Sequence, residues 1–263
     1  MPHALIKGTR LYYQDRGKGD PIVFLHCWAT NSSLWRHQLE YFSKKNRCIA
    51  TDYFGHGKTG GTYRSYHPEV FATHLHTLLN RLGLGKKKLV LVGHSLGGMV
   101  AMCYALKYPD QVRAMVLTDT TPGLMGFPEQ GIAALLAAPF VLLSTPLFRG
   151  LAAAATAMHP FASPLKRIEM VWHTRQSSNL ATTRTLMDVT RFNVTRRLRE
   201  IDTPTLIING SLDVYTDIRH SLLLRLLLKN STLEIVKFSG HTAPMENPDE
   251  FNRKMEKFIK NQE

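Results

Sequence analysis

The chain has 263 residues, 44 % of them apolar, and a formal net charge of +13 from 33 Lys and Arg against 20 Asp and Glu. A chain of this length can bury a complete core, and α/β folds of this size occur as single domains. The longest apolar run, from Ile132 to Leu143, includes Pro139 and is too short to cross a bilayer as a helix. We therefore expect no transmembrane segment.

The cysteine content and the first residues indicate the compartment. The three cysteines, Cys27, Cys48 and Cys103, are sparse and odd in number, which indicates reduced thiols. The stretch from Met1 to Lys7 lacks the apolar segment of a signal peptide, so we expect a cytoplasmic protein. The positive charge comes without a recognised nucleic-acid-binding motif, so it predicts a solvated surface and no nucleic-acid partner.

Short apolar runs alternate with helical patterns along most of the chain. Strands are predicted at 4–7, 10–15, 21–25, 47–51, 89–93, 112–118, 204–209 and 232–237, and helices at 33–44, 67–82, 96–108, 216–228 and 248–260. The first two strands form a hairpin around Gly8-Thr9, and helical crossovers join the later ones. The predicted fold class is α/β, with a mostly parallel, eight-stranded sheet flanked by helices.

Residues 122–200 depart from this alternation of strands and helices. Prolines at 128, 139, 146, 160 and 164 stand between short apolar helical runs, and the chain returns to the sheet only near Pro204. We predict a helical cap at 122–200, inserted after the sixth strand, and a core formed by 1–121 and 201–263. The many apolar side chains of the cap suggest an apolar pocket, for which Phe127, Met158 and Trp172 are candidate lining residues.

The turn between the strand at 89–93 and the helix at 96–108 carries a chemical signature. Gly93-His94-Ser95-Leu96-Gly97 fits the pattern G-x-S-x-G of a nucleophile elbow, which requires a strand before it and a helix after it. Such a tight turn strains the backbone at the serine, and glycines on both sides avoid Cβ clashes. The pattern predicts Ser95 as a nucleophile.

A serine hydroxyl needs a base to take its proton and a third group to orient that base. Asp213 follows the strand at 204–209, and His241 follows the strand at 232–237. Both are therefore expected at the sheet edge where parallel strands end and where ligands bind. The order serine, acid, histidine is the one that this elbow motif requires. Asp119, which follows the strand at 112–118, is the competing candidate for the acid.

With these motifs in order, the chain resembles the α/β-hydrolase superfamily over nearly its whole length. Leu25 to Trp28 looks like the His-Gly-x stretch after the third strand of that family, Asp52 to Thr59 matches its D-x-x-G-x-G-x-S/T loop, and Gly240 to Pro248 is similar to its histidine loop. The resemblance is to the serine esterases. Carboxylesterases, methyl-ester esterases that act on pimeloyl-carrier conjugates and enol-lactonases look most similar in length and motifs.

The resemblance implies an oxyanion hole made by the backbone N–H groups of Trp28 and Leu96. Cys27 departs from the family, which usually has glycine at this position. A Cβ there restricts the loop, so the N–H of Cys27 is the alternative second donor. Cys27 itself is expected to be a small apolar filler rather than a nucleophile.

The resulting hypothesis is a serine hydrolase with the triad Ser95, Asp213 and His241 that cleaves a carboxylic ester through an acyl-enzyme intermediate. No metal or organic cofactor is implied. The expected partner is a small-molecule ester, or an acyl chain on an acidic carrier attracted by basic cap residues such as Arg196, Arg197 and Arg199. Thioesterase, lactonase and C–C bond hydrolase activities use the same triad and stay open. A non-catalytic ligand receptor on a hydrolase scaffold is the alternative from another class.

Overall fold

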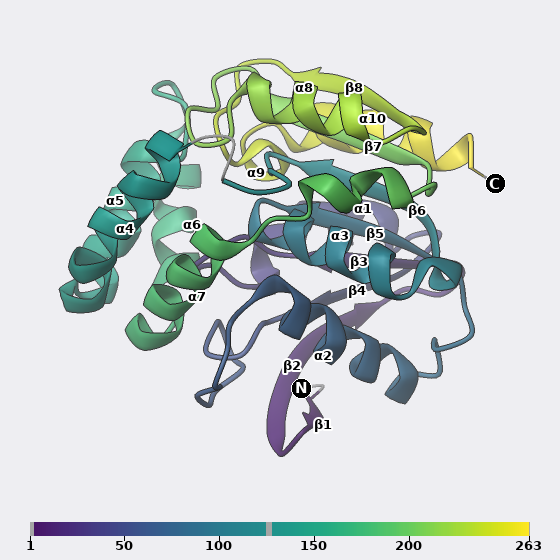
Figure 1. The fold of residues 1–263 in the computed structure, drawn as a ribbon, viewed down its shortest axis with the longest axis horizontal. Helices are drawn as coiled ribbons and strands as arrows, with labels where there is room; N and C mark the ends of the chain where they lie inside the picture. The colour runs from purple at the N-terminus through teal and green to yellow at the C-terminus, as the bar shows by residue number, and fades with distance from the viewer. Residues whose placement is uncertain (1–2, 125–127, 263) are drawn as a thin grey trace.

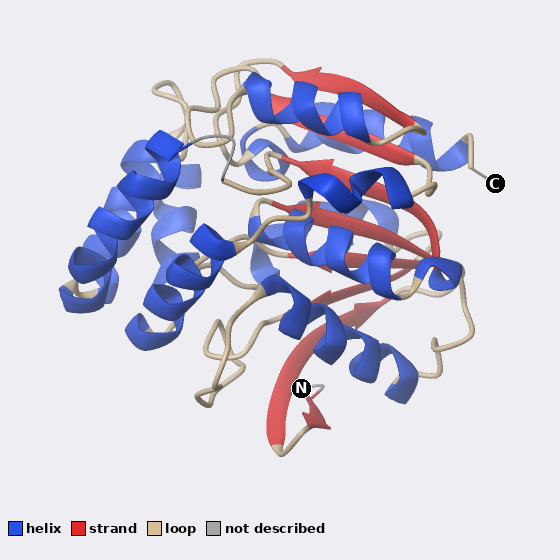
Figure 2. Ribbon diagram, viewed as in Figure 1, coloured by secondary structure: helices blue, strands red, loops and turns tan. Residues whose placement is uncertain are grey.

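A computed structural model describes residues 3–124 and 128–262 of the chain. Eight strands form one sheet in the order β1-β2-β4-β3-β5-β6-β7-β8. Figure 2 draws the strands in red, with the helices around them in blue. Their bounds are β1 His3–Ile6, β2 Thr9–Arg16, β3 Pro21–Leu25, β4 Arg47–Thr51, β5 Leu89–His94, β6 Val112–Thr118, β7 Thr205–Gly210 and β8 Ser231–Val236. The pairs β1–β2 and β2–β4 are antiparallel and the others are parallel, which confirms the predicted mostly parallel sheet.

Helices cover both faces of the sheet, and their bounds follow the predicted ones closely. They are α1 Arg36–Phe42, α2 Pro68–Arg81, α3 Leu96–Lys107, α8 Ile218–Leu227, α9 Ala243–Glu246 and α10 Pro248–Lys260, with short 3₁₀ helices η1 Ser32–Trp35, η2 Pro109–Gln111 and η3 Thr195–Glu200. The predicted helix at 33–44 is divided into η1 and α1. The one-turn helix α9 is not in the prediction, because Pro244 and its short length leave no periodic pattern.

Successive side chains of the central strands pack into two separate cores. On β5, Leu89 and Leu91 join the core under α2, α3 and α8, whereas Val90 and Val92 join the core under α1 and α10. This is the two-residue alternation of a strand that is buried on both faces. Figure 1 shows the two helical layers with the sheet between them.

Among the described residues, four α-helices stand between β6 and β7, where a helical insertion after the sixth strand was predicted. They are α4 Pro128–Leu143, α5 Pro146–Thr156, α6 Pro164–Arg175 and α7 Asn179–Arg191. Thr145, Ser163 and Ser178 cap the last three through side-chain oxygens. Pro128, Pro146 and Pro164 each begin a helix, and Pro160 lies in the segment between α5 and α6. Pro139 lies inside α4, which continues through it. The helices lie beyond the carboxyl ends of the strands, at the left of Figure 1.

Across the described ranges, no helix combines the length and the apolar character needed to cross a membrane.

Candidate active site

Ser95 occupies a strained turn between β5 and α3. Its backbone has φ 53° and ψ −114°, in the left-handed half of conformational space that side chains rarely adopt. A Cβ at Gly97 would lie 2.0 Å from the Leu25 carbonyl oxygen, and one at Gly93 would lie 2.3 Å from the Gly97 carbonyl oxygen. Only glycine therefore allows α3 to start this close to β3 and β5. The Ser95 N–H donates to the Thr118 carbonyl at 2.9 Å, which ties the turn to β6.

The structure brings Ser95, His241 and Asp213 together from three parts of the chain. Ser95 Oγ lies 3.0 Å from His241 Nε2, and His241 Nδ1 lies 2.9 Å from Asp213 Oδ2. Because a carboxylate only accepts, Nδ1 carries the proton and Nε2 is left to accept from the serine. Asp213 also accepts from Thr216 Oγ1 at 2.7 Å and from the Tyr215 N–H at 2.8 Å, so its position is fixed.

The charges in this group increase the proton affinity of His241 and keep Asp213 ionised. Burial acts to lower the pKa of His241, but the charge of Asp213 and its hydrogen bond raise that pKa above the ordinary 6.5. Burial acts to raise the pKa of Asp213, but the charge and hydrogen bond of His241 hold it well below its usual range. The pair is therefore built to hold an imidazolium once the histidine takes a proton.

Asp119 is fully buried beside the triad and has other partners. One of its oxygens accepts from the Gly210 N–H at 2.7 Å and from Asn209 Nδ2 at 3.2 Å, and the other accepts from Thr118 Oγ1 at 3.0 Å. These bonds connect the ends of β6 and β7. Burial, followed by the charge of Asp213, raises the pKa of Asp119 to about 7.

His94, the residue before the serine, holds the histidine loop in place. Its Nε2 lies 2.5 Å from the His241 carbonyl oxygen, across 147 residues of sequence. Burial lowers the pKa of His94 to about 3, so the ring is neutral and this nitrogen donates. No role for His94 could be predicted from the sequence, because the x positions of G-x-S-x-G carry no chemical requirement of their own.

The loop after β3 lies next to the start of α3. Ala29 has φ 59°, and the Thr30 N–H donates to the Cys27 carbonyl at 3.4 Å, so residues 27–30 form a tight turn. Within the described part of the chain, the backbone N–H groups of Trp28 and Leu96 have no protein acceptor. Cys27 is buried, its Sγ lies 3.2 Å from Thr30 Oγ1, and burial raises its thiol pKa to about 12. That thiol is therefore protonated and unreactive.

The helical insertion is tied to both loops of the site. Trp28 Nε1 donates to the Thr182 carbonyl at 2.7 Å, and Ser177 Oγ donates to the Ala29 carbonyl at 3.1 Å. On the histidine side, the His241 N–H donates to the Ala157 carbonyl at 2.7 Å. The position of the insertion therefore affects the geometry of both loops.

Glu246 provides a second connection to the histidine loop, which the sequence analysis missed. Its Oε1 accepts from the N–H groups of Gly240 and Thr242 at 3.0 Å and 3.1 Å. Its Oε2 accepts from the His159 N–H, in the segment between α5 and α6, at 2.7 Å. One buried carboxylate thus joins the histidine loop to the insertion. Its spacing of five residues from His241 is the only sequence signal.

The three candidate pocket residues have different surroundings. Met158 is buried, and its backbone lies against Gly240, immediately before His241. Trp172 is 57 % exposed on α6, and the Arg175 guanidinium lies over its ring at 4.8 Å. This exposure differs from the expected place in a closed pocket. Phe127 lies outside the described residues.

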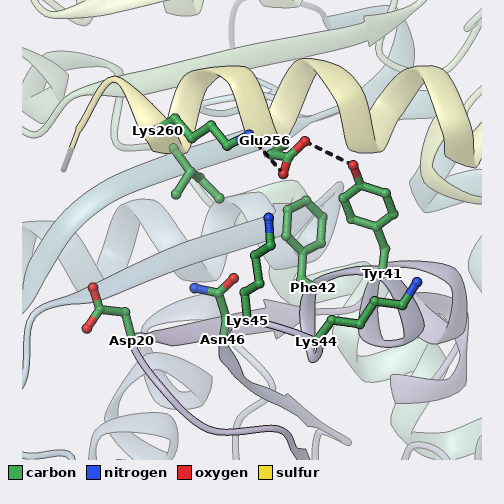
Figure 3. A pocket seen from close by; sticks show the side chains of 9 residues that line it. Asp20, Tyr41, Phe42, Lys44, Lys45, Asn46, Glu256 and Lys260 are labelled. Atoms are coloured by element: carbon green, nitrogen blue, oxygen red, sulfur yellow. Dashed lines mark hydrogen bonds and ion pairs between the residues drawn. The ribbon is translucent and has the colours of Figure 1, made fainter.

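Two other features lie away from Ser95. Arg196, Arg197 and Arg199 are on η3, which packs against α3 and α8. They therefore lie beside the core helices, whereas the sequence predicted them as basic residues of the cap. A cavity of about 350 Å³ lies near the amino ends of β3 and β4 (Figure 3). On one wall, Tyr41 donates to Glu256 at 2.9 Å. This cavity is at the opposite edge of the sheet from the triad.

Comparisons with known proteins place this site in context. The sequence model of a family described as "alpha/beta hydrolase fold" matches residues 20–248. A non-heme haloperoxidase of Rhodococcus erythropolis is 27 % identical, with 96 % of each chain covered. An esterase structure from Thermogutta terrifontis has a TM-score of 0.91 at 22 % identity, covering 100 % of this chain and 99 % of that one. An enzyme described as degrading N-acyl homoserine lactones has a TM-score of 0.85 at 27 % identity, covering 98 % and 100 %.

Proposed function

Because the chain belongs to the alpha/beta hydrolase fold family, we propose that it is a serine hydrolase that cleaves a carboxylic ester through an acyl-enzyme intermediate. One observation carries this proposal: the hydrogen-bonded series from Ser95 through His241 to Asp213, with steps of 3.0 Å and 2.9 Å. These distances are within the range required for transfer of the serine proton to a general base.

In the first half of the reaction, Ser95 Oγ attacks the acyl carbon and its proton passes to His241 Nε2. Asp213 stabilises the imidazolium, and the backbone N–H groups of Trp28 and Leu96 donate to the oxyanion. The imidazolium then protonates the leaving alcohol, and the acyl group stays on Ser95. In the second half, His241 takes a proton from water, the hydroxide attacks the acyl carbon, and the acid leaves as Ser95 regains its proton.

We further propose that residues 122–200 act as a cap over Ser95, with 1–121 and 201–263 as the hydrolase core. The bonds of Trp28, Ser177 and Glu246 between the insertion and the catalytic loops support this division. Met158 is the pocket candidate that we retain, because it is buried in the insertion next to the histidine loop. All three cysteines are free and buried, which supports a cytoplasmic location.

A second candidate function is lactone hydrolysis, which the same triad can perform by opening a cyclic ester. The observation that favours it is the 27 % identity to an enzyme described as degrading N-acyl homoserine lactones. The two candidates differ in the substrate and not in the catalytic residues.

The test is a panel of p-nitrophenyl esters of graded acyl length, with lactones and acyl thioesters measured beside them. We expect turnover of at least one ester series, and preference for lactones would select the second candidate. Ser95→Ala should lower kcat by about a millionfold, because it removes the nucleophile of an interdependent triad. Thermal unfolding of the variant should match the original chain.

Two outcomes would overturn the proposal. The first is substantial activity in purified, folded Ser95→Ala. The second is tight binding of esters with no turnover, which would indicate a receptor on a hydrolase scaffold.

A further inference from the structure

The helix α4 exposes an apolar face. Ile132, Leu136, Phe140 and Leu143 follow one another at intervals of four, four and three residues, so they share one side of the helix. All four side chains are exposed, from 58 % for Ile132 to 84 % for Leu143. A helix of a globular protein normally buries such a stripe, because contact with water forfeits the stabilisation of burial.

The exposure continues through the next two helices. Leu147, Phe148 and Leu151 are exposed at the start of α5, only a few residues beyond Leu143. On α6, which packs against α5, the exposed side chains are Leu165, Ile168 and Trp172, and Phe161 just before the helix is 88 % exposed. We call these side chains and the four on α4 the cap apolar surface. Exposed apolar groups in such density mark an interaction site.

The charges on α5 and α6 are positive and largely uncompensated. Residues 146–175 contain Arg149, Lys166, Arg167 and Arg175 against a single carboxylate, Glu169. The first three donate to backbone carbonyls and not to carboxylates. Glu169 is itself paired with Arg36 of the core at 3.0 Å. An apolar surface on these helices therefore comes with a positive potential.

We propose that the cap apolar surface docks on an anionic lipid bilayer. In this arrangement the exposed apolar side chains of α4, α5 and α6 enter the acyl region at the membrane interface. Arg175 is exposed and meets anionic headgroups, whereas the buried Arg149 and the partly buried Lys166 and Arg167 add positive potential behind the surface. Trp172 beneath Arg175 suits this boundary, because an indole ring and a guanidinium combine apolar area with polar groups. The docking does not depend on the chemistry at Ser95.

A second copy of the chain is a poorer occupant for the same surface. Each copy carries a net charge of +13, so two copies repel one another when these basic helices approach. An anionic bilayer supplies both the opposite charge and an apolar layer that needs no hydrogen-bonding partner. Charge complementarity therefore selects the lipid surface.

The test uses the full chain and the fluorescence of Trp172. Of the three tryptophans, Trp35 is fully buried and Trp28 is partly buried, whereas Trp172 is exposed. Vesicles that contain phosphatidylglycerol should shift the emission to shorter wavelength, and Trp172→Phe should abolish the shift. Phosphatidylcholine vesicles should bind at least tenfold more weakly. High salt should weaken binding to the anionic vesicles, because it screens the headgroup charge.

Cosedimentation with the same vesicles identifies the surface. Phe140→Gln with Leu143→Gln, and separately Phe161→Gln with Leu165→Gln, should weaken partitioning at least tenfold. The matched controls are Leu226→Gln and Phe238→Gln, both 75 % exposed but outside the cap, and they should bind like the original chain. All six substitutions are at exposed positions and leave the charge unchanged.

Three outcomes overturn the proposal. They are no binding to phosphatidylglycerol vesicles, equal binding by the cap variants, and equal losses in the controls. A dimer in light scattering that the cap variants dissociate, without vesicle binding, would assign the surface to self-association instead.

Discussion

Asp119 and Asp213 are two buried carboxylates that both act electrostatically on His241, and their surroundings give them different chemistry. Asp213 hydrogen-bonds the histidine, whereas Asp119 accepts from groups at the ends of β6 and β7. Both follow a parallel strand, so the sequence alone left the acid open between them. The difference lies in loop geometry: the Asp213 loop turns its carboxylate toward His241.

Exchanging each carboxylate for an amide tests this distinction. Asp213→Asn should lower kcat by about 10⁴-fold, because the amide no longer holds the correct tautomer of His241. Asp119→Asn should cost less than about tenfold in kcat but destabilise the fold by about 1–3 kcal/mol, because buried donors lose an acceptor. Ester kinetics and urea unfolding of both variants measure the two effects. If Asp119→Asn were the more damaging to kcat, the acid would be Asp119.

The pKa of His241 predicts the acid side of the pH profile. Burial acts to lower this pKa, but Asp213 raises it above 6.5, and only the neutral imidazole can take the serine proton. The value of kcat/KM should therefore rise with pH through a midpoint above 6.5. A profile of kcat/KM for a neutral ester measures that midpoint, and a value at or below 6.5 would contradict the assigned environment.

The turn at Ser95 shows how the start of helix α3 depends on glycines that carry no side chain. At Gly97, an added Cβ would meet the Leu25 carbonyl, which belongs to the backbone of a central strand and cannot move aside. Gly97→Ala should destabilise the fold by at least about 1–3 kcal/mol and displace the start of α3. Gly60→Ala is the matched control, because nothing lies within 4 Å of a Cβ there. Comparable unfolding midpoints for the two variants would disprove this packing argument.

The sequence predicts helices and strands well where a hydrophobic pattern repeats, and poorly where contacts between distant residues determine the structure. The sheet and long helices were predictable because strands buried on both faces read as apolar runs and helices keep their period. Helix α9 was not, since a single turn has no period. Likewise, the links from His94 to His241 and from Glu246 to His159 join distant residues, so they leave no local pattern.

At the scale of the whole molecule, composition gives the net charge but not its distribution. The arginines of η3 were expected around the serine because they belong to the same stretch of sequence as the cap. In the fold, η3 packs against α3 and α8, so its arginines lie beside the core. The exposure of apolar side chains on α4, α5 and α6 also depends on tertiary structure, because the sequence of an apolar helix does not show whether these side chains face the core or water.

The buried histidines predict how the whole fold responds to acid. Burial is the main cause that lowers the pKa of His26, His56 and His94 from 6.5 to about 3 in the folded chain. In the unfolded chain these rings take up protons near 6.5. Between those values the unfolded state binds more protons, so the stabilisation is complete above pH 6.5 and is lost as the pH falls toward 3.

Each such histidine should add about 1.4 kcal/mol per pH unit to the slope of the unfolding free energy over this window. Replacing one of them removes its proton uptake whatever the substitution does to stability itself, since a change of packing shifts the curve without changing its slope. His56→Gln should therefore reduce the slope by about that amount between about pH 4 and 6, as measured by urea unfolding at a series of pH values. Carboxylates with lowered pKa contribute to the slope in both proteins and cancel in the comparison. An unchanged slope would mean that His56 is protonated in the fold. The structure argues against this, because the buried ring has a single acceptor, the Phe54 carbonyl.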